Sequence, residues 1–547
     1  MEHGSLTHRV ANQTPPLPDF NLFAEDEALK EAVAREGLAA AVPGLLDTGR
    51  VLGTEEIRQQ AALANRYPPV FSAFNAQGER IDRLDFHPAW HALMRGIAAR
   101  GYHSGPWAGS LSHAARAAGY FMQAQVECGS LCPTTMTYGG IAAMRRDEGL
   151  NERWVPTLLS REYDPREAPI EEKRGGLIGM GMTEKQGGSD VRANTTRAVR
   201  SADGSFRLTG HKWFFSAPQC DAHLVLAQSE AGLSCFFMPR RLPDGTLNGI
   251  YIQRLKDKLG NRSNASSEVE FLDAWAQLLG EEGRGIPTIL EMGTYTRLDC
   301  VTGSAGMMRQ AVSLALHHAA HRRAFGALLS EQPLMQNVLA DLCIESDAAT
   351  ALAVRLARAF DSEAPAEAAL RRVLTSAAKF WVCKRGIELA AEAMEVLGGN
   401  GYTEELPLAR ILREMPVNSI WEGSGNIMCL DVLRAFAKSS VTTDALLAEL
   451  SAARGLDPHY DAAFESLAAR LKDPLEEHDG RGLAQQVVTL VQAALLLNGA
   501  PHAGARAVAE GFCVTRLNAT ARWGAVFGSS RLAGRERIVS RAALKLS

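Results

Sequence analysis

The sequence predicts a mainly α-helical protein with a central β domain. Residues 25–163 are rich in Ala, Leu, Arg and Glu at helical spacing, and Gly and Pro gather in the connections. Between residues 176 and 279, short apolar runs are separated by Asp-Gly, Gly and Pro, which is typical of strands and turns. Beyond residue 283 the helical spacing returns, and one run at 387–397 is followed by two glycines that would end a helix.

The length of 547 residues is enough for about three to five domains. We expect four: an N-terminal helical domain at 1–178, a β domain at 179–284, a helical bundle at 285–438, and an appended helical domain at 439–547. The chain is 46% hydrophobic and 22% charged, which excludes a mostly disordered, collagen-like or coiled-coil protein.

The cysteines and the apolar runs indicate a cytoplasmic protein that is not bound to a membrane. Nine cysteines with no CxxC pair provide neither a disulfide framework nor a zinc ribbon, so a reducing compartment is expected. No basic segment followed by an apolar run begins the sequence, and the longest apolar stretch, at 487–497, is interrupted by Thr489 and Gln492.

Several common catalytic motifs are absent. The glycines at 179–181 and 399–401 fail the GxGxxG pattern, and no GxxxxGK[ST] occurs, which disfavours Rossmann and P-loop nucleotide sites. Neither HExxH nor GxSxG is present, so we expect no metal-dependent protease or esterase chemistry and no metal site.

Three segments carry more specific information: Met182-Thr-Glu-Lys-Gln-Gly-Gly-Ser-Asp190, Gly210-His-Lys-Trp-Phe-Phe-Ser216, and Glu395-Val-Leu-Gly-Gly-Asn-Gly-Tyr402 with Ser419-Ile-Trp-Glu-Gly-Ser-Gly-Asn426. In the first, glycines let backbone N–H groups approach a flat ring or a phosphate, and hydroxyls can donate to its oxygens. An ordinary glycine-rich turn is the alternative interpretation. For the aromatic residues of the second segment, the alternative is a place in a strand core.

At these segments the chain resembles the acyl-CoA dehydrogenase family, and the helix–β–helix order and the Arg322-Arg-Ala-Phe-Gly326 segment agree with it. The resemblance covers roughly residues 50–438, with several motifs in the family's order. The exact residues of these motifs and the presence of extra C-terminal residues make the chain similar to the AidB subgroup of alkylation-response flavoproteins. The resemblance implies a helical domain, a β-barrel domain and a helical bundle, together with FAD as cofactor.

The resemblance also implies the residues that contact FAD. Gly398 and Gly399, which otherwise form a helix C-cap and turn, and Arg322 would touch the diphosphate of a neighbouring subunit, so a homotetramer is expected. The expected FAD-binding residues are Met182, Thr183, Gly188, Ser189, Phe214, Phe215, Ser216, Arg322, Gly398, Gly399, Trp421, Gly423, Ser424 and Asn426.

Glu422 is the candidate catalytic base. A carboxylate beside Trp and Gly would be partly desolvated, as suits a proton acceptor, although a surface glutamate beside a turn has the same sequence pattern. The resemblance implies that Glu422 removes the α-proton of a fatty acyl thioester. Some family members place the base on the earlier helix that here carries Thr296, and threonine cannot do that work.

The chain departs from the family pattern near the expected flavin. Glu395 stands where glutamine is common, Lys185 and Gln186 replace a proline-containing pair, and Phe214 takes a position that is often tryptophan. These differences put substrate turnover in question more than FAD binding.

The C-terminal region is basic: residues 481–547 contain nine Lys or Arg and two acidic residues. If residues 531–545 form one helix, their basic side chains fall within about a 160° arc. The resemblance implies that such a face binds duplex DNA. There are two alternatives: the face is only solvated, or it binds a membrane surface or a calmodulin-like partner. The expected DNA-binding residues are Arg516, Arg522, Arg531, Arg535, Arg537, Arg541 and Lys545.

Two functional hypotheses follow. In the first, the chain is a flavoprotein that binds double-stranded DNA and protects it during alkylation damage, with weak dehydrogenation of a short or branched acyl-CoA. In the second, it is a metabolic acyl-CoA dehydrogenase whose C-terminal region serves only packing or oligomerisation.

Overall fold

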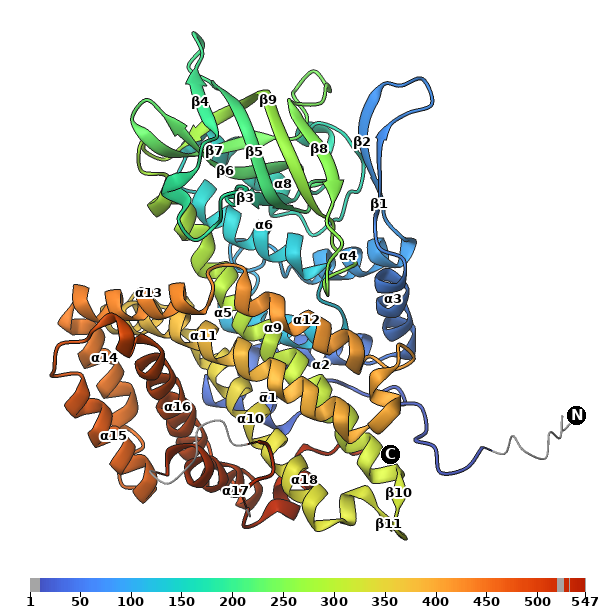
Figure 1. The fold of residues 1–547 in the computed structure, drawn as a ribbon, viewed down its shortest axis with the longest axis vertical. Helices are drawn as coiled ribbons and strands as arrows, with labels where there is room; N and C mark the ends of the chain where they lie inside the picture. The colour runs from blue at the N-terminus through green and yellow to red at the C-terminus, as the bar shows by residue number, and fades with distance from the viewer. Residues whose placement is uncertain (1–9, 519–525, 531, 547) are drawn as a thin grey trace, which may run out of the picture. The chain divides into compact units, whose positions relative to one another are not determined.

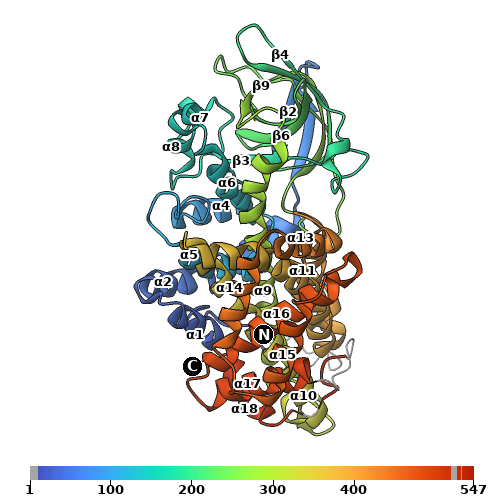
Figure 2. The ribbon, with the colours of Figure 1, turned by 90° about the vertical axis from the view of Figure 1, so that its left-hand side faces the viewer.

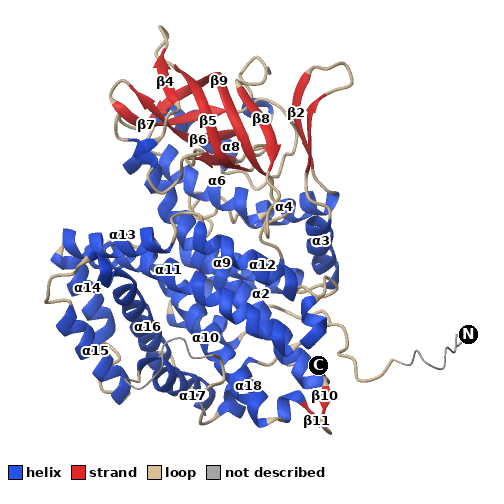
Figure 3. Ribbon diagram, viewed as in Figure 1, coloured by secondary structure: helices blue, strands red, loops and turns tan. Residues whose placement is uncertain are grey.

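The computed structural model describes residues 10–518, 526–530 and 532–546. The chain divides into two compact units, and we refer to them by their composition. The helical unit contains Met1–Glu55, Ser304–Pro416 and Cys429–Ser547, and the mixed unit contains Glu56–Gly303 and Val417–Met428. The predicted fold class, mainly helical with a central β domain and a C-terminal helical domain, is confirmed (Figure 3).

The mixed unit holds most of the strands (Figure 1). Its elements are α3 (Glu55–Arg66), β1 (Val70–Phe74), β2 (Arg80–Asp85), α4 (Pro88–Arg100), α5 (His113–Val126), α6 (Leu131–Met144), α7 (Glu148–Arg153), α8 (Val155–Leu158), β3 (Ile178–Gly181), β4 (Arg197–Arg200), β5 (Phe206–Ser216), β6 (Ala222–Ser229), β7 (Gly232–Pro239), β8 (Ile250–Leu255) and β9 (Ser266–Leu279).

Strands β3 to β9 of the mixed unit form one sheet that closes into a barrel, and β1 and β2 form a separate two-stranded sheet. The pairings run β6–β4–β5–β9–β7 and return from β7 to β6, while β3 pairs with β6 and β8 pairs with β9. Apolar side chains at alternate strand positions fill the interior, among them Phe206, Phe236 and Phe271. Helix α6 packs beside β3 (Figures 1 and 2). Strand β3 ends at Gly181, and the first of the three predicted motif segments begins at the next residue.

The helical unit is built from long helices. Its elements are α1 (Glu27–Arg35), α2 (Val42–Leu52), β10 (Arg323–Ala324), β11 (Ala327–Leu328), α10 (Pro333–Arg358), α11 (Pro365–Val396), α14 (Ser440–Ser451), α15 (Pro458–Arg470), α16 (Gly480–Asn498), α17 (Ala503–Phe512) and α18 (Arg535–Ala542). Besides α3, whose first residue lies in the helical unit, three described helices contribute residues to both units: α9 (Gly285–His321), α12 (Leu408–Ile420) and α13 (Gly425–Lys438).

Helices from the C-terminal region pack on α10 and α11 within the helical unit. Helix α16 contacts both α10 and α11, α14 contacts α11, and α17 and α18 contact α10 and each other (Figures 1 and 2). Local sequence supports these helices: Asp457 accepts hydrogen bonds from the first backbone N–H groups of α15, and Pro458 occupies its first position. Across the described residues, no helix combines the length and hydropathy that a membrane span needs.

Candidate active site

Glu422 lies in a short loop between α12 and α13, in the mixed unit. Its backbone has φ = +60°, a left-handed conformation that costs a non-glycine residue about 1–3 kcal/mol unless its surroundings hold it. Gly423 follows with φ = +107°, where a Cβ would meet the Cε of Met428 at 2.5 Å. Of the other expected loop residues, Trp421 and Ser424 are half-buried and Asn426 is exposed.

Two adjacent residues of α9 hold this loop. The hydroxyl of Thr296 lies 2.6 Å from Oε2 of Glu422, and Nε of Arg297 donates to the backbone carbonyl of Glu422 over 2.9 Å. One contact fixes the carboxylate and the other fixes the strained backbone. The side chain of the candidate base is therefore set by the helix beside it.

Cys132, at the start of α6, connects the candidate base with the barrel. Its buried thiol lies near Glu422 and near the side chains of Ser216 and Asn264, and burial raises the pKa of this thiol to about 12. Met182 and Trp421 pack against the same apolar cluster that contains Cys132. The structure thus places Ser216 and Glu422 near Cys132, and Met182 and Trp421 on the apolar cluster around it, whereas their contacts with FAD remain a prediction.

The segment after β3 folds over a buried ion pair. Oε1 of Glu184 lies 2.8 Å from Nζ of Lys212, and neither side chain is exposed. Glu184 also accepts hydrogen bonds from the backbone and hydroxyl groups of Thr195 and Thr196, and Lys212 donates to the carbonyl of Leu226. Burial lowers the pKa of Lys212 to about 8, so the lysine stays charged at neutral pH.

Glycine is required at position 188 of this segment. A Cβ there would lie 2.4 Å from the hydroxyl of Thr183, so the chain can fold this tightly only without a side chain. The backbone N–H of Trp213 donates to the carbonyl of Thr183 and ties the segment to β5. Ser189 is exposed at its outer end.

Strand β5 corrects one expected cofactor contact. Phe214 is 51% exposed, whereas Phe215 is buried in the barrel core and stacks on His223 at 4.2 Å between ring centroids. The register of β5 against β9 shifts between Lys212 and Phe215, and side chains then alternate across the sheet. Phe214 and Ser216 share the open face, so the assignment of the Phe215 side chain to FAD is wrong.

Arg322, Gly398 and Gly399 belong to the helical unit. Arg322 follows α9 and donates from Nη1 to the carbonyl of Asn12. Gly398 has φ = +59°, and a Cβ built at either glycine would meet nothing within 4 Å, which leaves open space beside the turn. Their contact with a neighbouring subunit's diphosphate remains a prediction.

Two of the expected DNA-binding arginines are internal, which corrects that assignment. Arg516 bridges Asp341 at 2.7 Å and Glu345 at 2.9 Å, and Arg541 pairs with Asp347 and with Glu31. Their side chains are only 11% and 6% exposed. A buried arginine held by two carboxylates cannot also neutralise a phosphate.

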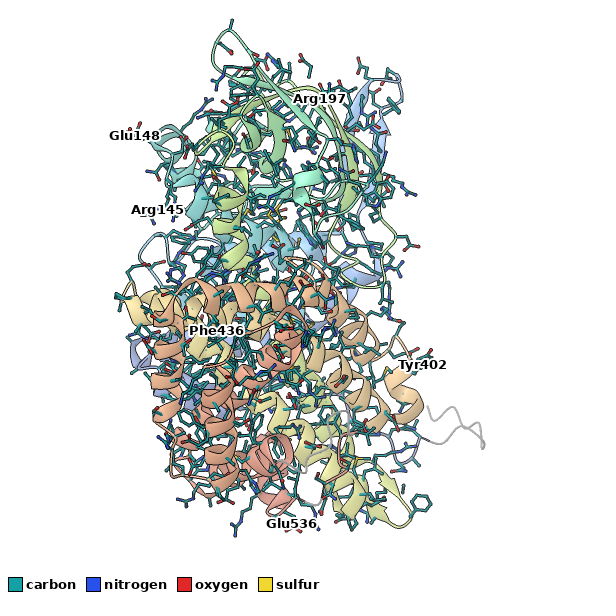
Figure 4. The ribbon with its side chains drawn as sticks, turned by 60° about the vertical axis from the view of Figure 1, so that its left-hand side comes forward. Arg145, Glu148, Arg197, Tyr402, Phe436 and Glu536 are labelled. Atoms are coloured by element: carbon teal, nitrogen blue, oxygen red, sulfur yellow. The ribbon has the colours of Figure 1, made fainter. Side chains whose placement is uncertain are left out.

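The condition for that basic arc, one continuous helix over 531–545, is not met by the described residues. Helix α18 begins after Gly534, whose φ is +69°, and ends at Ala542 because Ala543 turns into an extended conformation. Of the remaining expected residues, Arg535 donates to Gln336 and Arg537 is exposed beside Glu536, which Figure 4 labels. Lys545 pairs with Glu27 beyond the helix. Arg522 and Arg531 lie outside the described residues.

Sequence reasoning missed four residues of the site: Cys132, Glu184, Lys212 and Arg297, and it treated Thr296 only as a residue unable to act as a base. One signal was available. Glu184 and Lys212 sit inside the two motifs that identify the family, and a charged residue within a buried strand must find an opposite charge. Nothing in the local sequence marks Cys132.

A separate cavity of about 290 Å³ in the mixed unit does not include the candidate base. Its lining carries ion pairs that are satisfied locally, such as Lys173 with Asp221 and Arg240 with Glu167. In the part of the chain that the structure describes, no group of three or more His, Cys, Asp or Glu side chains could hold a metal ion.

Comparison with known families agrees with this arrangement. Residues 12–165 match the family model "Adaptive response protein AidB N-terminal domain", residues 179–274 match "Acyl-CoA dehydrogenase, middle domain", and residues 283–437 match "Acyl-CoA dehydrogenase, C-terminal domain". The chain therefore belongs to the acyl-CoA dehydrogenase family.

The chain is 52% identical over 515 residues to "Putative acyl-CoA dehydrogenase AidB" of Escherichia coli strain K12, covering 93% of this chain and 95% of that protein. The AidB-type resemblance predicted from the motifs is confirmed.

Solved structures share the fold. Caenorhabditis elegans ACDH-11 in complex with C11-CoA superposes with a TM-score of 0.83 at 26% identity, covering 96% of each chain. A Mycobacterium smegmatis glutaryl-CoA dehydrogenase in complex with FADH2 has a TM-score of 0.55 at 20% identity, covering 71% of this chain and 96% of that one, and shows the fold alone.

Proposed function

We propose that this chain is an FAD-dependent acyl-CoA dehydrogenase in which Glu422 is the proton acceptor. The observation that carries the proposal is how Glu422 is held: Thr296 binds its carboxylate and Arg297 binds its backbone carbonyl. A strained backbone held by its neighbours is typical of functional positions. Membership of the family and the acyl-CoA complex of the similar C. elegans protein support the substrate class.

The residues present fit FAD. The half-exposed ring of Phe214 next to the hydroxyl of Ser216 provides an apolar face and a polar group for a flat ring. The tight segment at Thr183 and Gly188 presents backbone and hydroxyl groups nearby. When bound, FAD supplies the acceptor for the hydride that leaves the β-carbon of the acyl chain. Met182, Ser189, Trp421, Gly423, Ser424 and Asn426 would complete the contacts from this unit.

The chain's own step is removal of the α-proton. The ionised carboxylate of Glu422 accepts that proton while the electron pair of the broken C–H bond forms the α–β double bond. The hydroxyl of Thr296 stabilises the charged carboxylate before transfer. Proton and hydride leave from adjacent carbons, so the products are an enoyl thioester, a protonated Glu422 and reduced cofactor.

Anaerobic mixing of the FAD-loaded protein with acyl-CoA tests this function. We expect loss of the flavin's visible absorbance with at least one short or branched acyl-CoA, because the cofactor is reduced only if the β-hydride transfers. A panel of straight and branched acyl chains covers the choices that the sequence leaves open. Absence of bleaching across the whole panel would count against dehydrogenation.

We also propose a homotetramer in the cytoplasm. Phe325, at the tip of the β10–β11 hairpin, is fully exposed, Leu334 is 82% exposed, and Tyr402, which Figure 4 labels, is 80% exposed. A second copy would cover these apolar groups and would bring Arg322, Gly398 and Gly399 to a neighbouring FAD. No two of the nine cysteines, all in the described part of the chain, form a disulfide, which supports a reducing compartment.

Binding to double-stranded DNA, with protection of that DNA from alkylation, is the second candidate function. It is supported by the similarity to AidB and by the excess of basic residues at 481–547. Among the expected DNA-binding residues that the structure describes, Arg516 and Arg541 are internal, whereas Arg537 and Lys545 are exposed and Arg535, two positions before Arg537, is half-buried. The internal role of Arg516 and Arg541 favours packing as the main use of this region.

Charge reversal at Arg535 and Arg537 tests the DNA interface. If DNA binds here, Arg535→Glu with Arg537→Glu should weaken binding and lower the slope of log K against log salt by about two, since each lost phosphate contact removes about one. Fluorescence anisotropy with duplex DNA across a salt series measures this. Lys438→Glu with Lys472→Glu, two exposed lysines of the helical unit, is the matched control. Equal effects of both pairs would mean that no local DNA surface exists at α18.

A further inference from the structure

The side chain of Thr296 is buried inside α9 and has two acceptors within reach. It is 1% exposed, and its Oγ1 lies 2.6 Å from Oε2 of Glu422 and 3.1 Å from the backbone carbonyl of Gly293. A hydroxyl carries one proton and can donate it to only one of these oxygens at a time. The two contacts must therefore alternate.

The alternation follows the protonation state of Glu422. When the carboxyl is ionised, the hydroxyl donates to Oε2, because a hydrogen bond to a charged acceptor is the stronger one. When the carboxyl holds a proton, it can donate to Oγ1, and the hydroxyl turns to the carbonyl of Gly293. Threonine side chains in helices commonly bond to a carbonyl one turn earlier, so this second state needs no change in the helix.

We propose that Thr296 is a positioning residue whose hydroxyl reverses its hydrogen bond as Glu422 gains a proton, and that it thereby sets the proton affinity of this carboxylate. The coupling between the two side chains stands on their geometry alone. Its catalytic meaning rests on the proposed function, in which Glu422 accepts the α-proton.

The other groups near Glu422 keep one charge across the range in which a carboxylate titrates. Arg297 of α9 is the adjacent cation, and a guanidinium remains protonated throughout. Cys132 of α6 remains a thiol, since burial raises its pKa to about 12. Lys258, between β8 and β9, faces Cys132 and donates to the carbonyl of Asn264. A carboxyl titration measured here therefore belongs to Glu422.

Infrared difference spectroscopy of the full-length holoprotein, without acyl-CoA, tests the coupling. The protonated-carboxyl band of Glu422 is isolated by subtracting the spectrum of Glu422→Gln at each pH. Thr296→Val removes the hydroxyl and keeps the shape, so the titration should shift upward by about one pH unit, because the hydrogen bond lost by the ionised carboxylate is stronger than the one lost by the protonated carboxyl. Thr296→Ser should restore the wild-type midpoint. Thr294→Val, on the exposed face of the same helix, should change nothing.

An unchanged midpoint in Thr296→Val would overturn the proposal, as would an equal shift in Thr294→Val. Should Thr296→Val fail to fold, Thr296→Ala removes the same hydroxyl and must give the same shift. The outcomes also separate from those of the dehydrogenase proposal. A shifted titration in a protein that no acyl-CoA bleaches keeps the coupling and rejects the activity, whereas bleaching with no shift keeps the activity and rejects the coupling.

Discussion

Replacing Glu422 with Gln is expected to abolish the bleaching of the flavin by acyl-CoA while FAD stays bound. The amide keeps the size of the side chain and can still accept a hydrogen bond from Thr296, but it cannot take up the α-proton. Since general base catalysis contributes about 10²–10⁴ to a rate, we expect a fall of about a thousandfold. Anaerobic stopped-flow absorbance measures the rate, and the ratio of flavin to protein absorbance measures cofactor content.

Glu171→Gln is the matched control for this substitution. Glu171 is a surface glutamate of the same unit, and it pairs with Arg153. Its loss should leave the bleaching rate within about twofold, because surface ion pairs contribute at most about 1 kcal/mol. If Glu422→Gln bleached as fast as this control, another group would have to be the base.

Lys212→Met should cause the largest loss of stability among single changes near the site. The substitution leaves the carboxylate of Glu184 buried without its cation, and breaking one side of a buried pair costs about 3–5 kcal/mol. Because Glu184 anchors the segment that contains Thr183 and Gly188, cofactor retention should fall as well. Thermal unfolding followed by flavin release measures both effects.

The double variant Glu184→Gln with Lys212→Met separates the ion pair from simple packing. In the double variant, residue 184 is a neutral glutamine, so no unpaired carboxylate is left buried. The double variant should therefore be more stable than Lys212→Met alone. Lys185→Met, one residue from Glu184 but exposed, should have no comparable effect. A loss in Lys185→Met as large as in Lys212→Met would indicate that the segment is sensitive to any change, and not to the buried charge.

The fold class could be predicted from the spacing of apolar residues along the chain, and the barrel from the family resemblance. The orientation of β5 could not. A period of two requires Phe214 and Phe215 to point to opposite faces, but the register shift against β9 decides which face is the interior. That shift depends on the partner strand.

The basic C-terminal region shows the limit of charge counting. The arginines at 516 and 541 are visible in the sequence, whereas the acids that bind them are far earlier: Glu345 and Asp347 of α10 are 171 and 194 positions away, and Glu31 of α1 is 510 positions away. A helical wheel assigns side chains to a face of their own helix and says nothing about which long-range partner covers that face. The prediction of a continuous basic surface failed for this reason.

The ion pairs between α10 and the C-terminal region have a consequence for how this protein can vary. Burial alone would raise the pKa of Glu345, but Arg385 and Arg516 hold it at about 2. Burial raises the pKa of Asp347 to about 6, and the ion pair with Arg541 opposes that rise. A relative whose chain stops near residue 438 lacks two of those arginines and would strand acids in an apolar interior. Such a relative should carry neutral residues at the positions of Glu345 and Asp347, so that α10 and the last hundred or so residues change together across the family.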